Sequence, residues 1–211
     1  MIIGLTGLYC AGKNHVSLLL EKRGLSVLDA DKVGHDVIQR ETEKIVLRFG
    51  KKILDSQGTV NRSVLGKLVF GNPAELAALE AIIHPAVNNL TEEWLAHQAA
   101  NQNSHCVINA ALLHKSSVFN RLGAILVVCA PFSIRFFRAI KRDKRDPWEL
   151  IKRIRSQKDL PRYKNRKTQP QLFSCPADIY TIQNSGFSGS RRNLEKQIDA
   201  VFSKLQLLKK Q

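Results

Sequence analysis

Eight consecutive residues near the amino terminus decide the fold: Gly7-Leu8-Tyr9-Cys10-Ala11-Gly12-Lys13-Asn14. An apolar run, 1–6, precedes them and predicts a buried strand, and the leucine-rich segment 16–20 that follows predicts a helix. Strand, glycine-framed loop, lysine and helix form the pattern of a phosphate-binding loop. The glycines permit a tight turn whose N–H groups point at phosphate oxygens, and the helix adds the positive end of its dipole. The stretch therefore predicts a nucleotide site in which Lys13 reaches the β- and γ-phosphates. A glycine turn without a ligand is the alternative.

Asn14 departs from this pattern. The residue after Gly-Lys is ordinarily Ser or Thr, whose hydroxyl holds Mg²⁺. An amide oxygen also binds a hard cation, but the longer side chain places that oxygen differently. Asn14 is thus the candidate metal ligand, and the efficiency of phosphoryl transfer is left open.

Composition narrows the class of protein. A length of 211 residues suits one domain with a helical insert. No run of about eighteen apolar residues occurs, and the amino terminus lacks a basic lead and a cleavage site, so we expect neither a membrane span nor a signal peptide. The cysteines lie far apart without a C-x-x-C pair, which indicates thiols in a reducing, cytoplasmic compartment; they are Cys10, Cys106, Cys129 and Cys175.

The net charge of +15 indicates an anionic partner. Much of the excess lies between residues 135 and 167. Nucleic acid is one candidate and a pair of phosphate-bearing substrates is another. The chain has no recognised nucleic-acid motif and only 7% aromatic residues, so nucleic acid is the least favoured partner. The oligomeric state is left open.

Two aspartates follow the second expected strand, 25–28, in the run Asp29-Ala30-Asp31. The carboxyl ends of parallel strands are where ligands of open α/β sheets bind, so Asp31 in particular is placed to handle a substrate hydroxyl or a metal shell. The alternative is that Asp29 or Asp31 caps a helix starting near Lys32.

Residues 41–103 contain no convincing strand and read as an inserted helical lobe able to cover an acceptor substrate. Within it, His84-Pro85 is expected to break one helix and start another. Buried strands are expected at 106–110, 125–129 and 178–182, followed by a final amphipathic helix. Alternating strands and helices behind a phosphate loop predict a doubly wound five-stranded parallel α/β sheet.

A basic helical hairpin follows the fourth strand. Its first helix is expected to bury Ile134, Phe137 and Ile140 and to expose Arg135 with its basic neighbours. The segment 160–174 reads as a loop. Arginines suit bidentate phosphate contact, so the segment 141–175 is interpreted as a lid over the transferring phosphoryl group. The alternative is a solvated basic face or a nucleic-acid patch.

Taken together, the phosphate loop, the expected lid and several further stretches resemble the sequences of the dephospho-CoA kinases. The matching stretches run from end to end: Gly4-Leu5-Thr6-Gly7, Gly12-Lys13, Asp29-Ala30-Asp31-Lys32, Asp55 with Gly58 to Arg62, Leu65 to Phe70, Leu79 to Pro85, Leu112-Leu113, Arg138 with Lys141-Arg142-Asp143, Arg155-Ser156-Gln157, Ala177-Asp178 and Asn184-Ser185-Gly186.

The resemblance implies a P-loop NTPase fold and transfer of the γ-phosphoryl group of ATP, with Mg²⁺, to the ribose 3′-hydroxyl of dephospho-CoA, the last step of CoA synthesis. It implies that the loop residues Gly7, Cys10, Ala11, Gly12, Lys13, Asn14 and His15 cradle ATP. Asp31 would orient or deprotonate the acceptor hydroxyl, and Arg142 with Arg138 would reach the phosphates from the lid side. Arg62 and His84 would hold the CoA moiety, although a His-Pro junction can be purely architectural. The implied core is 1–40, 104–140 and 176–211.

The chain departs from the family's pattern at two places that supply oxygen to the metal. Asn14-His15 replaces Ser-Thr, and Asn109 stands where the family has an acidic residue after strand three. Neutral ligands offer less charge to the ion that offsets charge developing in the transition state. A kinase-like protein that binds nucleotide or CoA with weak or lost transfer is therefore the alternative function.

Overall fold

The computed structural model describes residues 1–103, 105–143, 146, 148, 150–151, 177–185 and 190–205. These residues form two compact units, one from residues 1–28 together with the chain after 97, the other from residues 29–97. Most of the expected lid, including the loop 160–174, lies outside the described residues. The described residues include no helix long and apolar enough to cross a membrane.

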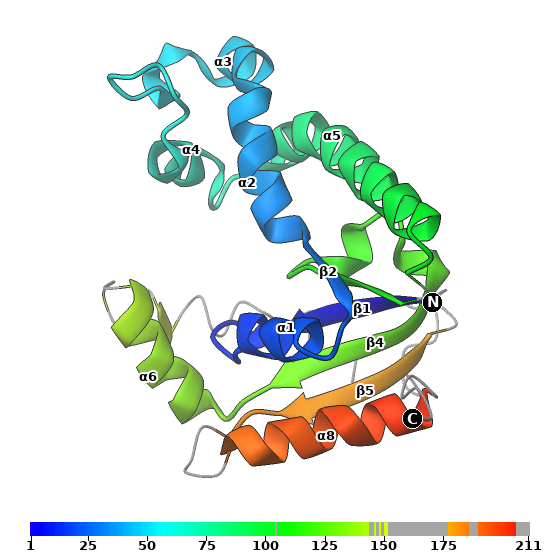
Figure 1. The fold of residues 1–211 in the computed structure, drawn as a ribbon. Coiled ribbons are helices and arrows are strands. Elements are labelled where there is room, and N and C mark those ends of the chain that lie inside the picture. The colour runs from blue at the N-terminus through cyan, green and yellow to red at the C-terminus, as the bar shows by residue number, and fades with distance from the viewer. Residues whose placement is uncertain are drawn as a thin grey trace. The chain divides into compact units, whose positions relative to one another are not determined.

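A five-stranded sheet forms the centre of the first unit (Figure 1). The strands are β1 (Ile2–Gly7), β2 (Ser26–Asp29), β3 (Cys106–Asn109), β4 (Leu122–Cys129) and β5 (Asp178–Gln183), in the spatial order β2-β3-β1-β4-β5. β1 pairs in parallel with β3 and β4, and β4 pairs in parallel with β5. The strand order reverses beside β1, where a doubly wound sheet binds its ligand. The predicted parallel α/β sheet is confirmed.

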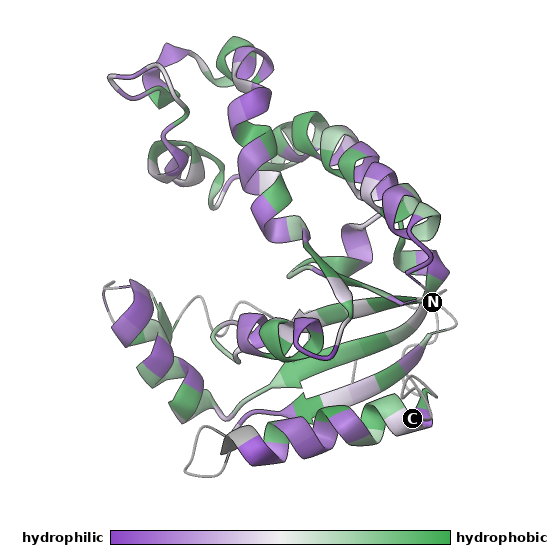
Figure 2. Ribbon diagram, in the orientation of Figure 1, coloured by the Kyte–Doolittle hydropathy of each residue, from purple (hydrophilic) through white to green (hydrophobic). Residues whose placement is uncertain are grey.

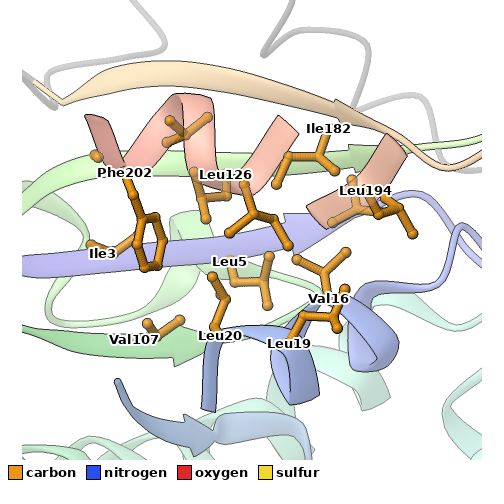
Figure 3. Packing of buried hydrophobic residues seen from close by; sticks show 14 of the residues in the cluster. Ile3, Leu5, Val16, Leu19, Leu20, Val107, Leu126, Ile182, Leu194 and Phe202 are labelled. Atoms are coloured by element: carbon orange, nitrogen blue, oxygen red, sulfur yellow. The ribbon is translucent and has the colours of Figure 1, made fainter. Parts of the chain in front are cut away.

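Helices α1 (Lys13–Glu21) and α8 (Ser190–Lys204) pack on one face of this sheet. Their apolar side chains close over β1 and β4, as Figure 3 shows for Leu19 and Leu20 of α1 and Leu194 and Phe202 of α8. β4 is hydrophobic along most of its length, as expected for a central strand, whereas α8 alternates polar and apolar residues (Figure 2). Two short 3₁₀ turns, η2 (Leu113–Lys115) and η3 (Phe119–Arg121), connect β3 to β4.

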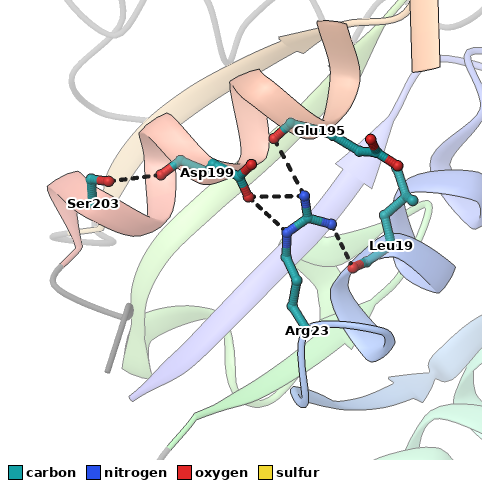
Figure 4. A network of polar contacts seen from close by, with 5 residues as sticks. All are labelled: Leu19, Arg23, Glu195, Asp199 and Ser203. Carbon is teal, nitrogen blue, oxygen red and sulfur yellow. Dashed lines mark hydrogen bonds and ion pairs between the residues drawn. The ribbon is translucent and has the colours of Figure 1, made fainter. Parts of the chain in front are cut away.

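A polar network ties the end of α1 to α8 (Figure 4). The Arg23 guanidinium donates to Asp199 Oδ1 at 2.8 Å, to the Leu19 carbonyl at 3.1 Å and to the Glu195 carbonyl at 3.4 Å. The planar fork of arginine serves all three acceptors at once, which a lysine ammonium on a single stem does less well. This network holds α1, the helix that begins directly after the phosphate loop, against α8.

The second unit is helical. It contains α2 (Ala30–Arg40), α3 (Thr42–Phe49), η1 (Lys51–Ile53), α4 (Arg62–Val69) and most of α5 (Pro73–Ala100). Its own core is formed by Ile45, Phe49, Ile53, Val60, Leu65, Val69 and Leu79. Residues 55–59 form a turn in which the Asp55 carboxylate accepts the N–H groups of Gln57 and Thr59 and the Thr59 hydroxyl. These hydrogen bonds lower the pKa of Asp55.

The expected helix break at His84-Pro85 is wrong. α5 runs without interruption from Pro73 to Ala100 with Pro85 inside it. A proline removes only one intrahelical hydrogen bond, and the segments on either side of it, 74–83 and 86–100, are rich in alanine, leucine and glutamate, which favour helix. The helix therefore continues through the proline.

Candidate active site

The loop between β1 and α1 begins with a close approach of two backbones. Gly7 lies beside Val128 of β4, and a Cβ atom at position 7 would lie 2.8 Å from the Val128 carbonyl oxygen. The Leu8 N–H still donates to that carbonyl at 3.1 Å, so the sheet ladder extends one residue into the loop. Glycine is required at position 7 because any side chain there would push β1 away from β4.

The loop then turns tightly onto the helix. The Ala11 N–H donates to the Leu8 carbonyl at 2.9 Å, and Cys10 and Gly12 have the left-handed φ angles of 57° and 95°. The Gly12 carbonyl accepts the N–H groups of His15 and Val16 and so begins α1. The first turn of α1 carries no acidic side chain. No acidic side chain there competes with an anionic group for the positive end of the helix dipole, as the phosphate-loop interpretation requires.

Lys13 and Asn14 occupy the first turn of α1, with Lys13 half-buried and Asn14 and His15 exposed. Ala11 is fully buried beneath the turn. The structure therefore brings Gly7, Cys10, Ala11, Gly12, Lys13, Asn14 and His15 together around one tight backbone turn.

Two side chains hold the loop from behind. The Asn184 amide Nδ2 donates to the Ala11 carbonyl at 2.8 Å, and Arg138 Nη1 donates to the same oxygen at 3.2 Å. Arg138 Nη2 also donates to Asn184 Oδ1 at 3.0 Å, which joins the two side chains. Asn184 comes from the end of β5, Arg138 from α6 (Phe132–Asp143). In the sequence, Asn184 stands out only within the family-like stretch Asn184-Ser185-Gly186, and no motif pointed to this contact with the loop.

The orientation expected for α6 is wrong. Arg135 and Ala139 are buried, whereas Phe137 and Ile140 are 69% and 39% exposed. Arg138 faces the phosphate loop because its guanidinium donates to the Cys10 and Ala11 carbonyls, which an apolar side chain cannot do. The Nε and Nη1 atoms of Arg135 have no hydrogen-bond partner among the described residues, and burial lowers the pKa of this guanidinium. The group nevertheless stays charged at neutral pH.

Arg142 lies at the outer side of the loop. Its guanidinium stacks over the Tyr9 ring at 4.9 Å from the ring centre and pairs with Asp143 at 2.6 Å. The contact with Tyr9 keeps the exposed guanidinium close to the loop. Contact of Arg138 and Arg142 with phosphate stays a prediction.

The acceptor-side candidates lie in the second unit. Asp29 is the N-cap of α2, with its carboxylate accepting the Lys32 N–H at 3.1 Å, and Asp31 lies exposed in the first turn. Arg62 is the exposed first residue of α4, and His84 precedes Pro85 within α5. Because capping occupies Asp29, the better candidate for the acceptor hydroxyl is Asp31, whose role stays a prediction.

The two candidate Mg²⁺ ligands that the sequence singled out at the loop and at the end of β3 are neutral amides. Asn14 is exposed in the first turn of α1. Asn109, at the end of β3, is 1% exposed, and neither of its amide atoms has a hydrogen-bond partner among the described residues. Among these residues no group of three or more His, Cys, Asp or Glu could hold a metal ion. Such a set fits an Mg²⁺ ion carried mainly by the nucleotide's own phosphates and water.

Fold and loop together define the class: a P-loop protein whose glycine-framed loop follows the central strand β1. The sequence model of the dephospho-CoA kinase family matches residues 1–169. The dephospho-CoA kinase of Halalkalibacterium halodurans is 33% identical over 169 residues, which are 79% of this chain and 84% of the relative. That of Shouchella clausii is 32% identical over 207 residues, 97% and 98% of the two chains.

Two solved structures share the fold of this chain. A Thermus thermophilus protein matches with a TM-score of 0.78 and 30% identity over 97% of each chain. The dephospho-CoA kinase of Campylobacter jejuni, at 20% identity, shares the fold with a TM-score of 0.59 over 97% of this chain and 96% of its own. This chain belongs to the dephospho-CoA kinase family.

Proposed function

We propose that the chain transfers the γ-phosphoryl group of ATP to the ribose 3′-hydroxyl of dephospho-CoA and releases CoA and ADP. The observation that carries the proposal is the loop of residues 7–13, which is closed by left-handed Gly12 onto a helix start without acidic side chains. The chain's membership of the dephospho-CoA kinase family indicates dephospho-CoA as the acceptor.

In this reaction the loop N–H groups and Lys13 bind the β- and γ-phosphates and offset the charge that develops on them. Asp31 takes the proton of the acceptor 3′-hydroxyl while the hydroxyl oxygen bonds to the γ-phosphorus. At the same time the bond between the γ-phosphorus and the β–γ bridging oxygen breaks, and ADP leaves. Arg142 adds positive charge from the loop's outer side. Asn14 would be the protein ligand of a divalent ion, which would supply further charge neutralisation.

The experiment is a steady-state assay of CoA and ADP formation with Lys13→Ala and Asp31→Asn. Lys13→Ala should abolish turnover, and Asp31→Asn should lower kcat by about 10²–10⁴-fold with little change in KM for ATP, as loss of a general base does. Turnover unchanged in Lys13→Ala would rule out the loop as the ATP site. The exposed Lys44, which pairs with Glu41 on α3, provides the matched control Lys44→Ala and should leave the rate unchanged.

Asn14 tests the alternative, a protein that binds nucleotide but transfers slowly or not at all. Asn14→Ser restores the hydroxyl that the motif ordinarily carries, so it should raise kcat with Mg²⁺ if the amide limits metal ligation. The measurement is kcat for wild type and variant in Mg²⁺ and in Mn²⁺. An unchanged kcat in both metals would show that Asn14 is not what limits the rate.

We also propose a cytoplasmic location, where ATP and a reducing environment are both present.

A further inference from the structure

We propose that Asn184 is a positioning residue for the phosphates of ATP, acting through the Ala11–Gly12 peptide of the loop. This inference rests on the proposed ATP site. It assigns a role to a buried side chain that contacts the loop through the Ala11 carbonyl.

The geometry of the contact identifies the amide's orientation. The Ala11 carbonyl can only accept, so it must face the Asn184 NH₂ group, and Arg138 can only donate, so it must face the Asn184 oxygen. The Asn184 backbone N–H is in turn held by the Cys129 carbonyl at 2.8 Å, and the residue is 4% exposed. Asn184 is therefore locked to β4, to α6 and to the loop at once (Figure 1 shows the elements).

The effect on the loop follows from peptide geometry. In a trans peptide the C=O and the next N–H point in opposite directions. Two donors that hold the Ala11 carbonyl on the Asn184 side thus aim the Gly12 N–H to the other side, which is the side of the bound phosphates in a phosphate loop. A guanidinium and an amide on the carbonyl also polarise the peptide, which makes this N–H a stronger donor.

Gly12 is adapted to the same contact. A Cβ atom at position 12 would collide with the Asn184 amide nitrogen and would come within 3.5 Å of Arg138 Nη1. Glycine here serves two purposes: it adopts the left-handed φ of 95°, and it lets Asn184 reach the loop.

The test replaces one amide by an isosteric carboxylate. Asn184→Asp keeps shape and acceptor to Arg138 but loses the donor to Ala11, and it places an oxygen against the carbonyl oxygen. We expect binding of ATP to weaken about tenfold or more, the equivalent of one hydrogen bond lost and one repulsion gained. KM for dephospho-CoA should stay within about twofold, because the variant changes only the ATP-side loop.

Gln197→Glu is the matched control. Gln197 on α8 makes the same kind of amide clamp on the neighbouring residue, accepting the Gln183 N–H at 2.8 Å and donating to the Gln183 carbonyl at 3.0 Å, but it does not touch the loop. The same amide-to-carboxylate change there should leave ATP affinity unchanged. A second variant, Asn184→Ala, removes the donor without adding charge and should weaken ATP binding in the same direction.

Inorganic tripolyphosphate separates a phosphate role from an adenine role. Its affinity, measured by displacement of a fluorescent ATP analogue, should fall by the same factor as that of ATP in Asn184→Asp. Equal tripolyphosphate affinity in wild type and variant, with weaker ATP binding, would overturn the inference in favour of an adenine contact. Unchanged ATP binding in both folded Asn184 variants would overturn it outright, whereas failure of wild type to bind ATP would overturn the proposed function instead.

Discussion

The conformation of the phosphate loop depends on single residues, most clearly on Gly12. Gly12→Ala should lower ATP affinity at least tenfold, because alanine at a left-handed φ costs about 1–2 kcal/mol and its Cβ displaces Asn184. The measurement is the ATP dissociation constant. Gly24→Ala is the matched control: Gly24 has a φ of 83° with nothing within 4 Å of the added Cβ. Gly24→Ala should lower the free energy of unfolding but leave the ATP dissociation constant unchanged. An equal loss of ATP affinity in both variants would contradict the argument that Asn184 needs glycine at position 12.

His105 makes stability depend on pH. Burial lowers its pKa, the positive amino terminus lowers it further, and its Nδ1 atom has no hydrogen-bond partner among the described residues. The folded chain therefore binds a proton at His105 less readily than the unfolded chain, so stability falls as pH drops below about 6.5, the unfolded value. His105→Gln removes this titration and should make the free energy of unfolding depend less on pH. Urea unfolding of both proteins between pH 7.5 and 5.5 tests it, and identical slopes would contradict the assignment.

At the scale of elements, the Arg23 network should hold α1 to α8. Arg23→Ala should lower the free energy of unfolding by about 1–2 kcal/mol, because it removes three hydrogen bonds from a partly buried guanidinium. Arg48, an exposed arginine with one ion-pair contact to Glu75 at 2.8 Å, is the control. Arg48→Ala should cost less than about 1 kcal/mol. Equal costs by urea unfolding would mean that the network adds nothing beyond a surface ion pair.

The elements also show what a sequence can predict here. The loop, the strands and the caps follow from local chemistry: Asn61 caps α4 and Asn72 caps α5 with side-chain oxygens, as those residue types favour. The face of α6 does not follow, because Arg135 is buried against local preference by groups distant in the chain. Asn184 meets Ala11 across 173 residues, and no periodicity encodes such a contact.

The whole molecule combines a parallel sheet that carries the phosphate loop with a separate helical unit. Its charge of +15 suits polyphosphate ligands as well as nucleic acid, and salt separates the two. We expect ATP affinity to fall only a few-fold between 50 and 200 mM salt, since one nucleotide is bound at one site. A DNA affinity that falls by about 10³-fold over the same range, from a tight value at low salt, would instead indicate a nucleic-acid binder.

The central claim is phosphoryl transfer to dephospho-CoA, and one labelling measurement tests it most directly. The purified chain is incubated with dephospho-CoA and ATP labelled in the γ-phosphoryl group, first with Mg²⁺ and then with Mn²⁺, and the products are separated. We predict label in CoA at the ribose 3′ position, one ADP released for each CoA formed, and no labelled CoA with Lys13→Ala. Unlabelled acceptor with both metals, in a protein that still binds ATP, would contradict the account and leave a nucleotide-binding protein without transfer.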